Sequence, residues 1–282
     1  MSRPLPAVTE ELKLGRIGTD SKQAQHRGSL RQTTHTDWEA YWRSFEAPER
    51  INYTPQIIDT LGAHIDLQGC RILEIGAGTG GNSSALASLG GAVTALDLVW
   101  PALQRIVTTG RKTGVGLDVV QGDAWHLPFR SGAFDLIFHQ GFLEHFADPW
   151  GLVREQRRVL RKMGYLLIDV PQRYNLYTIY KKRRISRGDW DYGGWETEFS
   201  YRQLRHMVTE CGFRPVESYG RGVFPTLISA RNQLKRLEKL LLKAQGFPAV
   251  VWRLYDGLWH RLEHSNIGRN TLMCIGILAQ KV

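Results

Sequence analysis

From Arg71 onward, short apolar runs alternate with longer segments in which apolar residues recur every three or four positions. The short runs predict β-strands, and the longer segments predict amphipathic helices. Seven runs have the length and composition of strands: 71–75, 92–97, 116–123, 134–140, 164–171, 214–220 and 271–279. Apolar strands that alternate with helices are typical of a parallel sheet covered on both faces, so the pattern predicts an α/β protein.

The helices expected between these strands begin and end at recognisable signals. They cover 81–90, 99–110, 148–164 and 200–213. Gly164 is expected to end the third of these helices, and Ser200 to cap the fourth. A further helix is predicted within residues 36–45, with Thr36 or Asp37 as its cap.

The same pattern predicts the domain organisation. Residues 1–36 are polar and lack apolar periodicity, which indicates a flexible basic arm. Residues 37–222 form the expected core, and 269–282 supply its last strand. The segment 223–268 interrupts the alternation and predicts a helical insertion or lid. Its apolar residues form two stripes at helical spacing: Leu227, Leu234, Leu237 and Leu241, then Val251, Leu254, Leu258 and Leu262.

The first strand runs into a glycine-rich turn, "RILEIGAGTGGNSS", whose spacing fits two templates. Gly76, Gly78 and Gly81 match G-x-G-x-x-G, the fingerprint of a dinucleotide site. Glu74 with Gly76, Gly78 and Gly80 matches E-x-G-x-G-x-G, a pattern associated with S-adenosylmethionine. In both cases the missing side chains let the backbone approach a ligand, and the next helix points its amides there.

Acidic residues at the ends of the first three strands help to decide between the templates. Glu74 would put a carboxylate where a pyrophosphate has to sit, whereas the same charge is favourable beside a methionine ammonium group. Asp97 ends the second strand, at the spacing where an acidic residue accepts hydrogen bonds from both ribose hydroxyls. Both candidate cofactors contain a ribose, so Asp97 does not distinguish between them. Asp123 closes the third strand and can accept the adenine amino group.

Each of these residues also has a structural interpretation. Gly80 or Gly81 can permit close helix packing, Asp97 can cap the next helix, and Asp123 can cap a turn. Ligands of open α/β sheets bind at the carboxyl ends of the strands. The joint occurrence of these residues at successive strand ends therefore favours S-adenosylmethionine.

At these residues the chain resembles the class I S-adenosylmethionine-dependent methyltransferases, in particular the bacterial group that includes the ubiquinone and menaquinone biosynthesis methyltransferases. The likeness rests on "ILEIGAGTGGNS", "VTALD", "GDAWHLPF" and "FDLIFHQGFLEHFADP", and it extends over roughly residues 70–220. It implies a Rossmann-like seven-stranded sheet whose last strand is antiparallel. It also implies the cofactor-binding residues: Glu74, Gly76, Ala77, Gly78 and Gly80 at the methionine end, Asp97 and Leu98 at the ribose, Asp123 and Ala124 at the adenine, and Gln140 after the fourth strand.

The activity that the resemblance implies is methyl transfer to an oxygen or carbon of a small-molecule or lipid-type acceptor. Such a displacement requires alignment and the exclusion of water, and a hydroxyl or acidic-carbon acceptor also requires a base. The candidate catalytic bases follow the fourth strand: His139, Glu144 and His145. The alternative for His145 is a structural histidine that holds the loop, and His139 can face the helices.

The charge of the chain changes this picture only in part. Lys and Arg number 37 against 27 Asp and Glu, which gives a formal net charge of +10 and favours an anionic partner. Basic and aromatic residues gather in 172–200, which indicates either a lid over an anionic acceptor or a loop with solvated charges. The basic residues of 223–268 indicate either peripheral membrane contact or packing over the acceptor cleft. A further basic stripe, expected to be a solvated face, comprises Arg154, Arg157, Arg158 and Arg161.

Other features exclude several classes of protein. Cys70, Cys211 and Cys274 are scattered, which predicts reduced thiols and neither a disulfide framework nor a metal site. No apolar run approaches the length of a membrane span, and the N-terminal residues lack a secretory apolar region, so we expect a cytoplasmic protein.

Two competing functions are compatible with parts of the sequence. The basic charge permits an RNA methyltransferase, although no separate RNA-binding module or tetrapeptide for a flipped base is visible. The fold also permits a non-catalytic binding protein, although the complete set of ligand positions argues against it.

Overall fold

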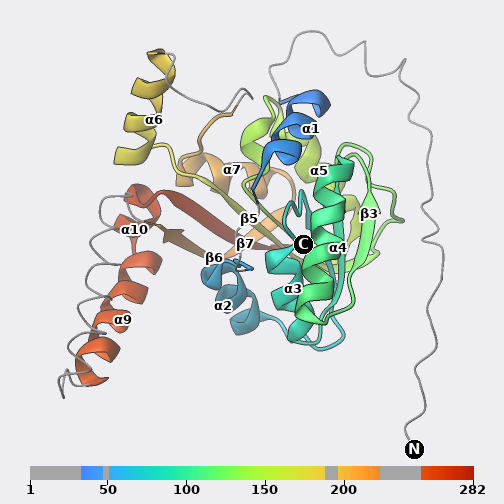
Figure 1. Cartoon of the computed structure of the whole chain (residues 1–282). Helices are drawn as coiled ribbons and strands as arrows, with labels where there is room; N and C mark the ends of the chain where they lie inside the picture. Colours follow the sequence, from blue (N-terminus) through green and yellow to red (C-terminus); the bar gives the residue numbers. More distant parts are fainter. Residues whose placement is uncertain (1–32, 47–50, 188–195, 223–248) are drawn as a thin grey trace, which may run out of the picture. The chain divides into compact units, whose positions relative to one another are not determined.

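The computed structural model describes residues 33–46, 51–187, 196–222 and 249–282 (Figure 1). All of these residues belong to one compact unit, which runs from Arg31 to Val282. The predicted arm lies outside the described residues up to position 32. The first part of the predicted insertion, 223–248, also lies outside them.

In the described part of the chain, seven strands form one sheet in the order β3-β2-β1-β4-β5-β7-β6. They are β1 (Arg71–Ile75), β2 (Ala92–Asp97), β3 (Asp118–Gln121), β4 (Phe134–Gln140), β5 (Leu160–Pro171), β6 (Phe213–Arg221) and β7 (Cys274–Lys281). The first five strands pair in parallel, and β7 is antiparallel to both β5 and β6. This topology confirms the predicted α/β sheet with an antiparallel last strand.

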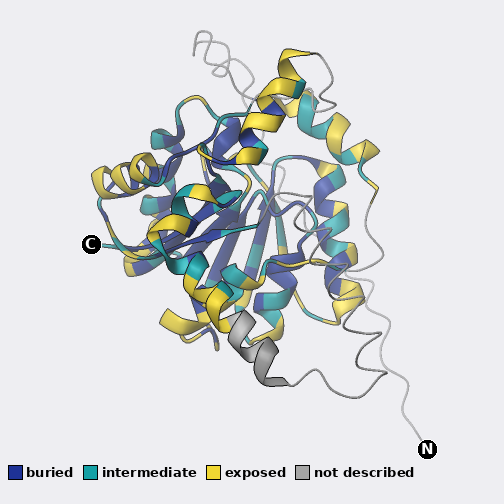
Figure 2. Cartoon of the chain, turned by 90° about the vertical axis from the view of Figure 1, so that its left-hand side faces the viewer, coloured by how far each residue is buried: buried dark blue, intermediate teal, exposed yellow. Residues whose placement is uncertain are grey.

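Helices cover both faces of the sheet (Figure 1). The described ones are α1 (His35–Ser44), α2 (Pro55–His64), α3 (Gly81–Ser88), α4 (Trp100–Thr113), α5 (Pro149–Val159), α6 (Leu176–Ser186), α7 (Tyr201–Glu210), α9 (Ala249–His264) and α10 (Asn266–Thr271), with a 3₁₀ turn, η2 (Leu143–His145). Side chains of β1 alternate between two cores: Ile72 packs with residues of α2 and α3, and Leu73 with residues of α5 and α7. Figure 2 shows the strands as a buried layer between the helices.

Two predicted helix boundaries are wrong, whereas the predicted cap at Ser200 is confirmed. α1 is capped by Thr34 and not by Thr36 or Asp37, because Thr34 and Asp37 form a reciprocal capping box. α5 ends at Val159 and not at Gly164, because Leu160 already pairs with Phe134 of β4. Pairing in the sheet therefore overrides the helical spacing of the charged residues that follow.

The predicted basic stripe is divided by this boundary. Arg157 lies on α5 and donates to the carbonyl oxygen of Val282 at 3.1 Å, whereas Arg161 lies on β5 and pairs with Asp135 at 2.5 Å. Arg158 pairs with Glu155 at 2.7 Å. These arginines therefore form specific contacts, although Arg158 and Arg161 are still exposed, as expected for a solvated face.

The segment before β7 is helical where the structure describes it. α10 extends to Thr271, past the predicted end of the insertion at 268, and β7 begins at Cys274. Leu258, one of the predicted stripe residues, is 66% exposed, so the stripe is not buried at this position. Among the described residues, none of the helices is both long and apolar enough to cross a membrane.

Candidate functional site

The glycine turn after β1 lies beneath two aromatic side chains. Gly76 and Gly78 both have positive φ angles, +66° and +54°, which favour glycine. A Cβ on Gly78 would lie 2.7 Å from the Trp42 indole of α1, and one on Gly76 would lie 2.9 Å from the Phe142 ring. The absence of side chains therefore lets these rings, and any ligand beside them, approach the backbone.

Helix α1 is held over the turn at both of its ends. Arg105 of α4 donates to the carbonyl oxygens of Trp42 and Phe45 at the C-terminal end. At the other end, the Thr33 hydroxyl lies 3.2 Å from Nδ1 of His145, and the Trp38 ring packs edge-on against the same imidazole. The sequence suggested the helix but gave no signal for its position, because both attachments join residues far apart in the chain.

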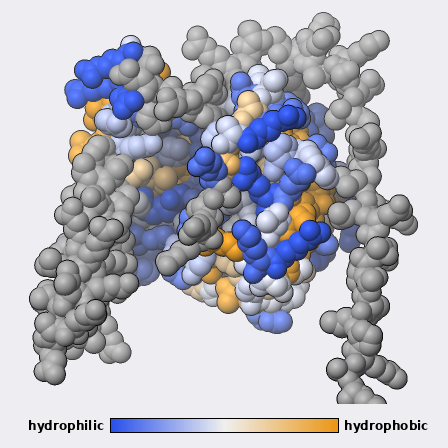
Figure 3. Space-filling model, in the orientation of Figure 1, coloured by the Kyte–Doolittle hydropathy of each residue, from blue (hydrophilic) through white to orange (hydrophobic). Residues whose placement is uncertain are grey.

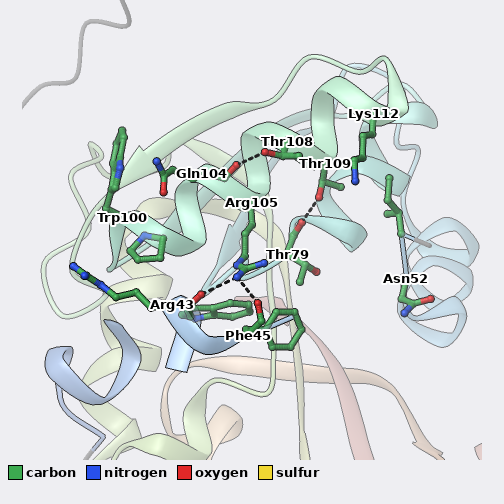
Figure 4. A pocket seen from close by; sticks show the side chains of 13 residues that line it. Arg43, Phe45, Asn52, Thr79, Trp100, Gln104, Arg105, Thr108, Thr109 and Lys112 are labelled. Atoms are coloured by element: carbon green, nitrogen blue, oxygen red, sulfur yellow. Dashed lines mark hydrogen bonds between the residues drawn. The ribbon is translucent and has the colours of Figure 1, made fainter. Parts of the chain in front are cut away.

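A cavity of about 710 Å³ lies between α1 and α4, beside Thr79 of the turn (Figure 4). Trp42, Trp100 and Arg105 are among its lining residues. Arg105 points toward the carbonyl oxygen of Phe45, and Thr109 donates to the carbonyl oxygen of Thr79 at 2.6 Å. The cavity therefore borders the turn from the side of α4.

Glu74 is buried at the end of β1 and faces the start of α3. Its carboxylate accepts hydrogen bonds from the Ser83 amide at 3.0 Å and the Ser83 hydroxyl at 2.5 Å. Burial raises the pKa of Glu74 to about 7, although these hydrogen bonds act in the opposite direction. In this structure Glu74 therefore links β1 to the first turn of α3.

Asp97, at the end of β2, contacts the glycine turn directly. Its carboxylate accepts from the Gly78 amide at 3.0 Å and from the Val99 amide at 3.3 Å. Burial raises the pKa of this carboxyl above its usual range. Leu98 follows and is half-buried. The end of β2 is thus joined to the glycine turn after β1 by a hydrogen bond from a backbone amide to a side-chain carboxylate, at the predicted ribose position.

Asp123 and Ala124 lie one strand further along, after β3. The Asp123 carboxylate accepts from the Trp125 amide at 3.0 Å and remains exposed, whereas Ala124 is buried. The turn-capping alternative for Asp123 is therefore realised, and its second carboxylate oxygen lies 4.0 Å from Nδ1 of His126. This exposure leaves the carboxylate accessible to a ligand as well.

Gln140, at the end of β4, belongs to a polar network that the sequence analysis missed. Its side-chain oxygen accepts from the Thr54 hydroxyl and from the Asn82 amide group, both at 2.9 Å. Asn82 in turn accepts from the Thr54 backbone amide at 2.8 Å. The network joins the residue before α2, the first turn of α3 and the end of β4. Gln140 was a predicted site residue and Asn82 lies within the motif "GGNSS", whereas Thr54 carried no sequence signal.

The two predicted histidines occupy different environments. His139 is fully buried, its ring centre is 5.3 Å from that of Phe142, and burial lowers its pKa to about 3. It is therefore neutral near neutral pH. His145 is also buried, and it contacts Thr33 and Trp38 of the N-terminal segment. These contacts favour the structural alternative for His145.

Glu144 lies on η2 between these histidines and the residues after β5. Its side chain is buried, and one carboxylate oxygen, Oε2, has no hydrogen-bond partner among the described residues. Burial raises the pKa of Glu144 to about 8, with Glu196 and Asp169 adding to the shift and Lys181 opposing it. A buried carboxyl group with an unsatisfied oxygen is suited to holding or receiving a proton.

A charged cluster lies beside Glu144 and attaches helix α6. Lys181 of α6 is buried and pairs with Glu196 at 2.8 Å and Glu198 at 2.9 Å. Burial alone would lower its pKa, but the hydrogen bonds that Lys181 donates to these two carboxylates raise its pKa above the usual value. Lys181 is one of the basic residues of 172–200, which were expected either to belong to a lid over an anionic acceptor or to be solvated, and its burial in ion pairs shows that it is not solvated.

Comparison with known proteins identifies the family to which this arrangement belongs. Residues 73–168 match the methyltransferase domain. The chain carries a class I methyltransferase domain. The methyltransferase domain extends from β1 into β5, and it contains every predicted cofactor-binding residue.

Two curated relatives are similar to this methyltransferase domain. The ubiquinone biosynthesis O-methyltransferase of Xanthomonas oryzae pv. oryzae is 32% identical over 136 residues, which are 47% of this chain and 56% of the relative. The fatty-acid O-methyltransferase of Mycolicibacterium smegmatis is 34% identical over 134 residues, 46% of this chain and 48% of the relative. The chain thus spans about half the length of these relatives. Among solved structures, a SAM-dependent methyltransferase from Aquifex aeolicus is similar to this chain with a TM-score of 0.53 and 15% sequence identity. The match covers 86% of this chain and 98% of the Aquifex chain, and it shows the fold.

The methyltransferase domain implies S-adenosylmethionine as cofactor, and the residues present fit it. The strand ends offer carboxylates at Asp97 and Asp123, whose negative charge is favourable beside a sulfonium. The glycine turn offers a backbone that a Cβ would obstruct at Gly76 and Gly78. A ligand at this turn contacts the Trp42 ring or displaces it.

Proposed function

We propose that the chain is an S-adenosylmethionine-dependent methyltransferase acting on an oxygen or carbon of a small-molecule or lipid-type acceptor. The observation that carries this proposal is the match of residues 73–168 to the methyltransferase domain. When bound, S-adenosylmethionine supplies a methyl group activated by a sulfonium. The names of the relatives, one for ubiquinone biosynthesis and one for fatty acids, support the acceptor class.

The proposed cofactor site lies at the carboxyl ends of β1 to β4, as expected for an open α/β sheet. The methionine end is assigned to Glu74, Gly76, Ala77, Gly78 and Gly80, the ribose to Asp97 and Leu98, the adenine to Asp123 and Ala124, and the region after β4 to Gln140. The hydrogen bond between Asp97 and the Gly78 amide supports a shared role for these two residues.

Glu144 is the group that we propose as proton acceptor for a hydroxyl acceptor substrate. Phe142, two residues before it, lies against Gly76 of the turn, and one carboxylate oxygen of Glu144 is buried without a hydrogen-bond partner among the described residues. Glu144 was one of three predicted bases, and the burial and contacts of the other two, His139 and His145, support positioning roles. Glu144 must be ionised to accept a proton, so its raised pKa predicts activity that increases toward alkaline pH.

A cytoplasmic location is part of the proposal. The three cysteines are free and at least partly buried, which is typical of a reducing compartment. Membrane contact through 223–268 remains a prediction, since residues 223–248 lie outside the described part of the chain.

The experiment is label transfer from methyl-labelled S-adenosylmethionine to separated fractions of lipids, quinone precursors and RNA. We expect label in an organic-soluble product, and we expect Asp97→Asn to reduce it. Asp118→Asn is the matched control, because this exposed aspartate lies at the opposite end of the neighbouring strand β3. Label in RNA alone would favour an RNA methyltransferase. Cofactor binding without any transfer would favour a non-catalytic protein.

A further inference from the structure

Helix α6 follows β5 closely and is attached to the rest of the chain along one side. Thr178 is buried and donates to the carbonyl oxygen of Gln172 at 2.8 Å. One turn further, Lys181 is buried in its pairs with Glu196 and Glu198. Because Thr178 and Lys181 are three residues apart, they lie on the same face of the helix. The opposite face therefore points away from the protein.

That opposite face exposes large apolar side chains. Leu176 is 69% exposed, Ile179 50% and Tyr180 42%. Tyr174, which precedes α6, and Ile185, on another face of the helix, are exposed as well, so five of the fourteen large hydrophobic residues that are exposed in the described part of the chain lie within twelve positions. Single exposed apolar residues are normal on proteins, but such a cluster indicates an interaction surface.

The same face also carries positive charge. Helical spacing places five positions in one row: 176, 179, 180, 183 and 187. Arg183 and Arg187 therefore continue the row that begins with Leu176. Both arginines are exposed, as is Lys182. α6 contains no acidic residue, and Figure 3 shows hydrophilic and hydrophobic atoms next to one another on this helix. Apolar and cationic side chains are therefore combined on one surface.

We propose that α6 is a docking surface for an anionic lipid bilayer. In this arrangement Leu176, Ile179 and Tyr180 enter the interface between headgroups and acyl chains, and Arg183 and Arg187 contact lipid phosphates. Charge complementarity selects this occupant, because a nucleic acid would offer phosphates without an apolar layer for the first three residues. The surface is distinct from the insertion 223–268, for which membrane contact was predicted from sequence.

Docking through α6 is independent of the proposed methyl transfer, because it concerns a different surface. It would nevertheless bring a lipid-type acceptor close to the site, since α6 follows the carboxyl end of β5. A binding assay without cofactor or acceptor therefore tests the docking surface alone.

The experiment is co-sedimentation of the full chain with vesicles of phosphatidylcholine, with and without phosphatidylglycerol. We expect binding only to the anionic vesicles, with affinity that falls as salt is added. Arg183→Gln with Arg187→Gln should weaken binding by about 30-fold. Leu176→Ser with Ile179→Ser should weaken it by at least about tenfold.

Matched controls place the same changes elsewhere. Arg111→Gln with Lys112→Gln removes two exposed cations from the last turn of α4, and Leu89→Ser removes one exposed apolar side chain after α3. These variants should bind as the unchanged protein does. Each α6 variant is compared with the unchanged protein in thermal unfolding, and an equal midpoint temperature shows that the variant is folded.

Three results would overturn the docking proposal. One is binding that is equally strong to neutral and anionic vesicles, or the absence of binding to both. Another is undiminished binding of the folded α6 variants. The third is an α6-dependent affinity for RNA that exceeds the affinity for anionic vesicles.

Discussion

The proposed site at the end of β4 has a cofactor side and an acceptor side, and the two are built in different ways. On the cofactor side, buried carboxylates accept hydrogen bonds from backbone amides and a nearby hydroxyl, as Glu74 does from Ser83 and Asp97 from Gly78. On the acceptor side, Lys181 is buried among carboxylates, and Glu144 keeps an unsatisfied oxygen. The first side is thus defined by backbone geometry, and the second by charged side chains.

This difference indicates where binding and where chemistry are controlled. Backbone amides hold the carboxylates of the cofactor side in fixed positions, which suits a ligand that does not vary. The buried charges of the acceptor side respond to protonation and to their neighbours. Changes on the acceptor side should therefore alter rate and stability, whereas changes on the cofactor side should alter affinity.

The largest effect is expected from Glu144→Gln. Removing a proton acceptor should lower kcat by about 10²–10⁴-fold while the affinity for S-adenosylmethionine stays unchanged. For the unchanged enzyme, kcat/KM should rise with pH and level off above about 8, and the variant should lack this rise. Steady-state kinetics over pH, combined with a cofactor titration, measures both quantities. Activity close to that of the unchanged enzyme would exclude Glu144 as the base.

The next largest effect concerns the attachment of α6. Lys181→Met leaves Glu196 and Glu198 without their buried partner, and should reduce the free energy of unfolding by about 3–5 kcal/mol. Lys182→Met is the matched control, because this exposed lysine pairs with the same Glu198 at 3.1 Å and should cost about 1 kcal/mol or less. Denaturant unfolding compares the two variants, and equal losses would contradict the assigned difference in burial.

A pH-dependent effect on stability, smaller per pH unit than the loss expected at Lys181, follows from the raised pKa of Glu144. Between the ordinary value of 4.5 and about 8, the folded protein keeps a proton that the unfolded chain releases. The free energy of unfolding of the unchanged protein should therefore fall with rising pH relative to that of Glu144→Gln, by up to about 1.4 kcal/mol per pH unit. Denaturant unfolding at several pH values measures the slope. Parallel curves for the two proteins would show that the Glu144 pKa is not raised.

Most of the fold could be predicted from the sequence because its signals are local. The strands β1, β2 and β4 are short apolar runs that end at an acidic residue or just before a glycine, and the Gly78–Asp97 contact joins two motif positions only nineteen residues apart. The end of α5 was predicted wrongly because Leu160 pairs with Phe134 of β4 in the sheet. Helical spacing in the sequence does not reveal this pairing.

The acceptor side could be predicted only in outline, for the same physical reason. Lys181 lies among the basic residues of 172–200, and its spacing gives no sign of burial. Its burial depends on Glu196 and Glu198, which follow after an intervening segment. Trp42 and Thr54 gave no signal because they reach the site from helices and loops that precede the motifs. Long-range packing, which residue spacing cannot show, determines all of these positions.

Calorimetric titration of the purified protein with S-adenosylmethionine, its demethylated product and NADH tests the assigned cofactor most directly. We expect both sulfur compounds to bind and NADH not to bind. Asp97→Asn should weaken the binding by about 10–100-fold, while Asp118→Asn leaves it unchanged. Heat of binding with NADH, together with none from S-adenosylmethionine, would contradict the assignment.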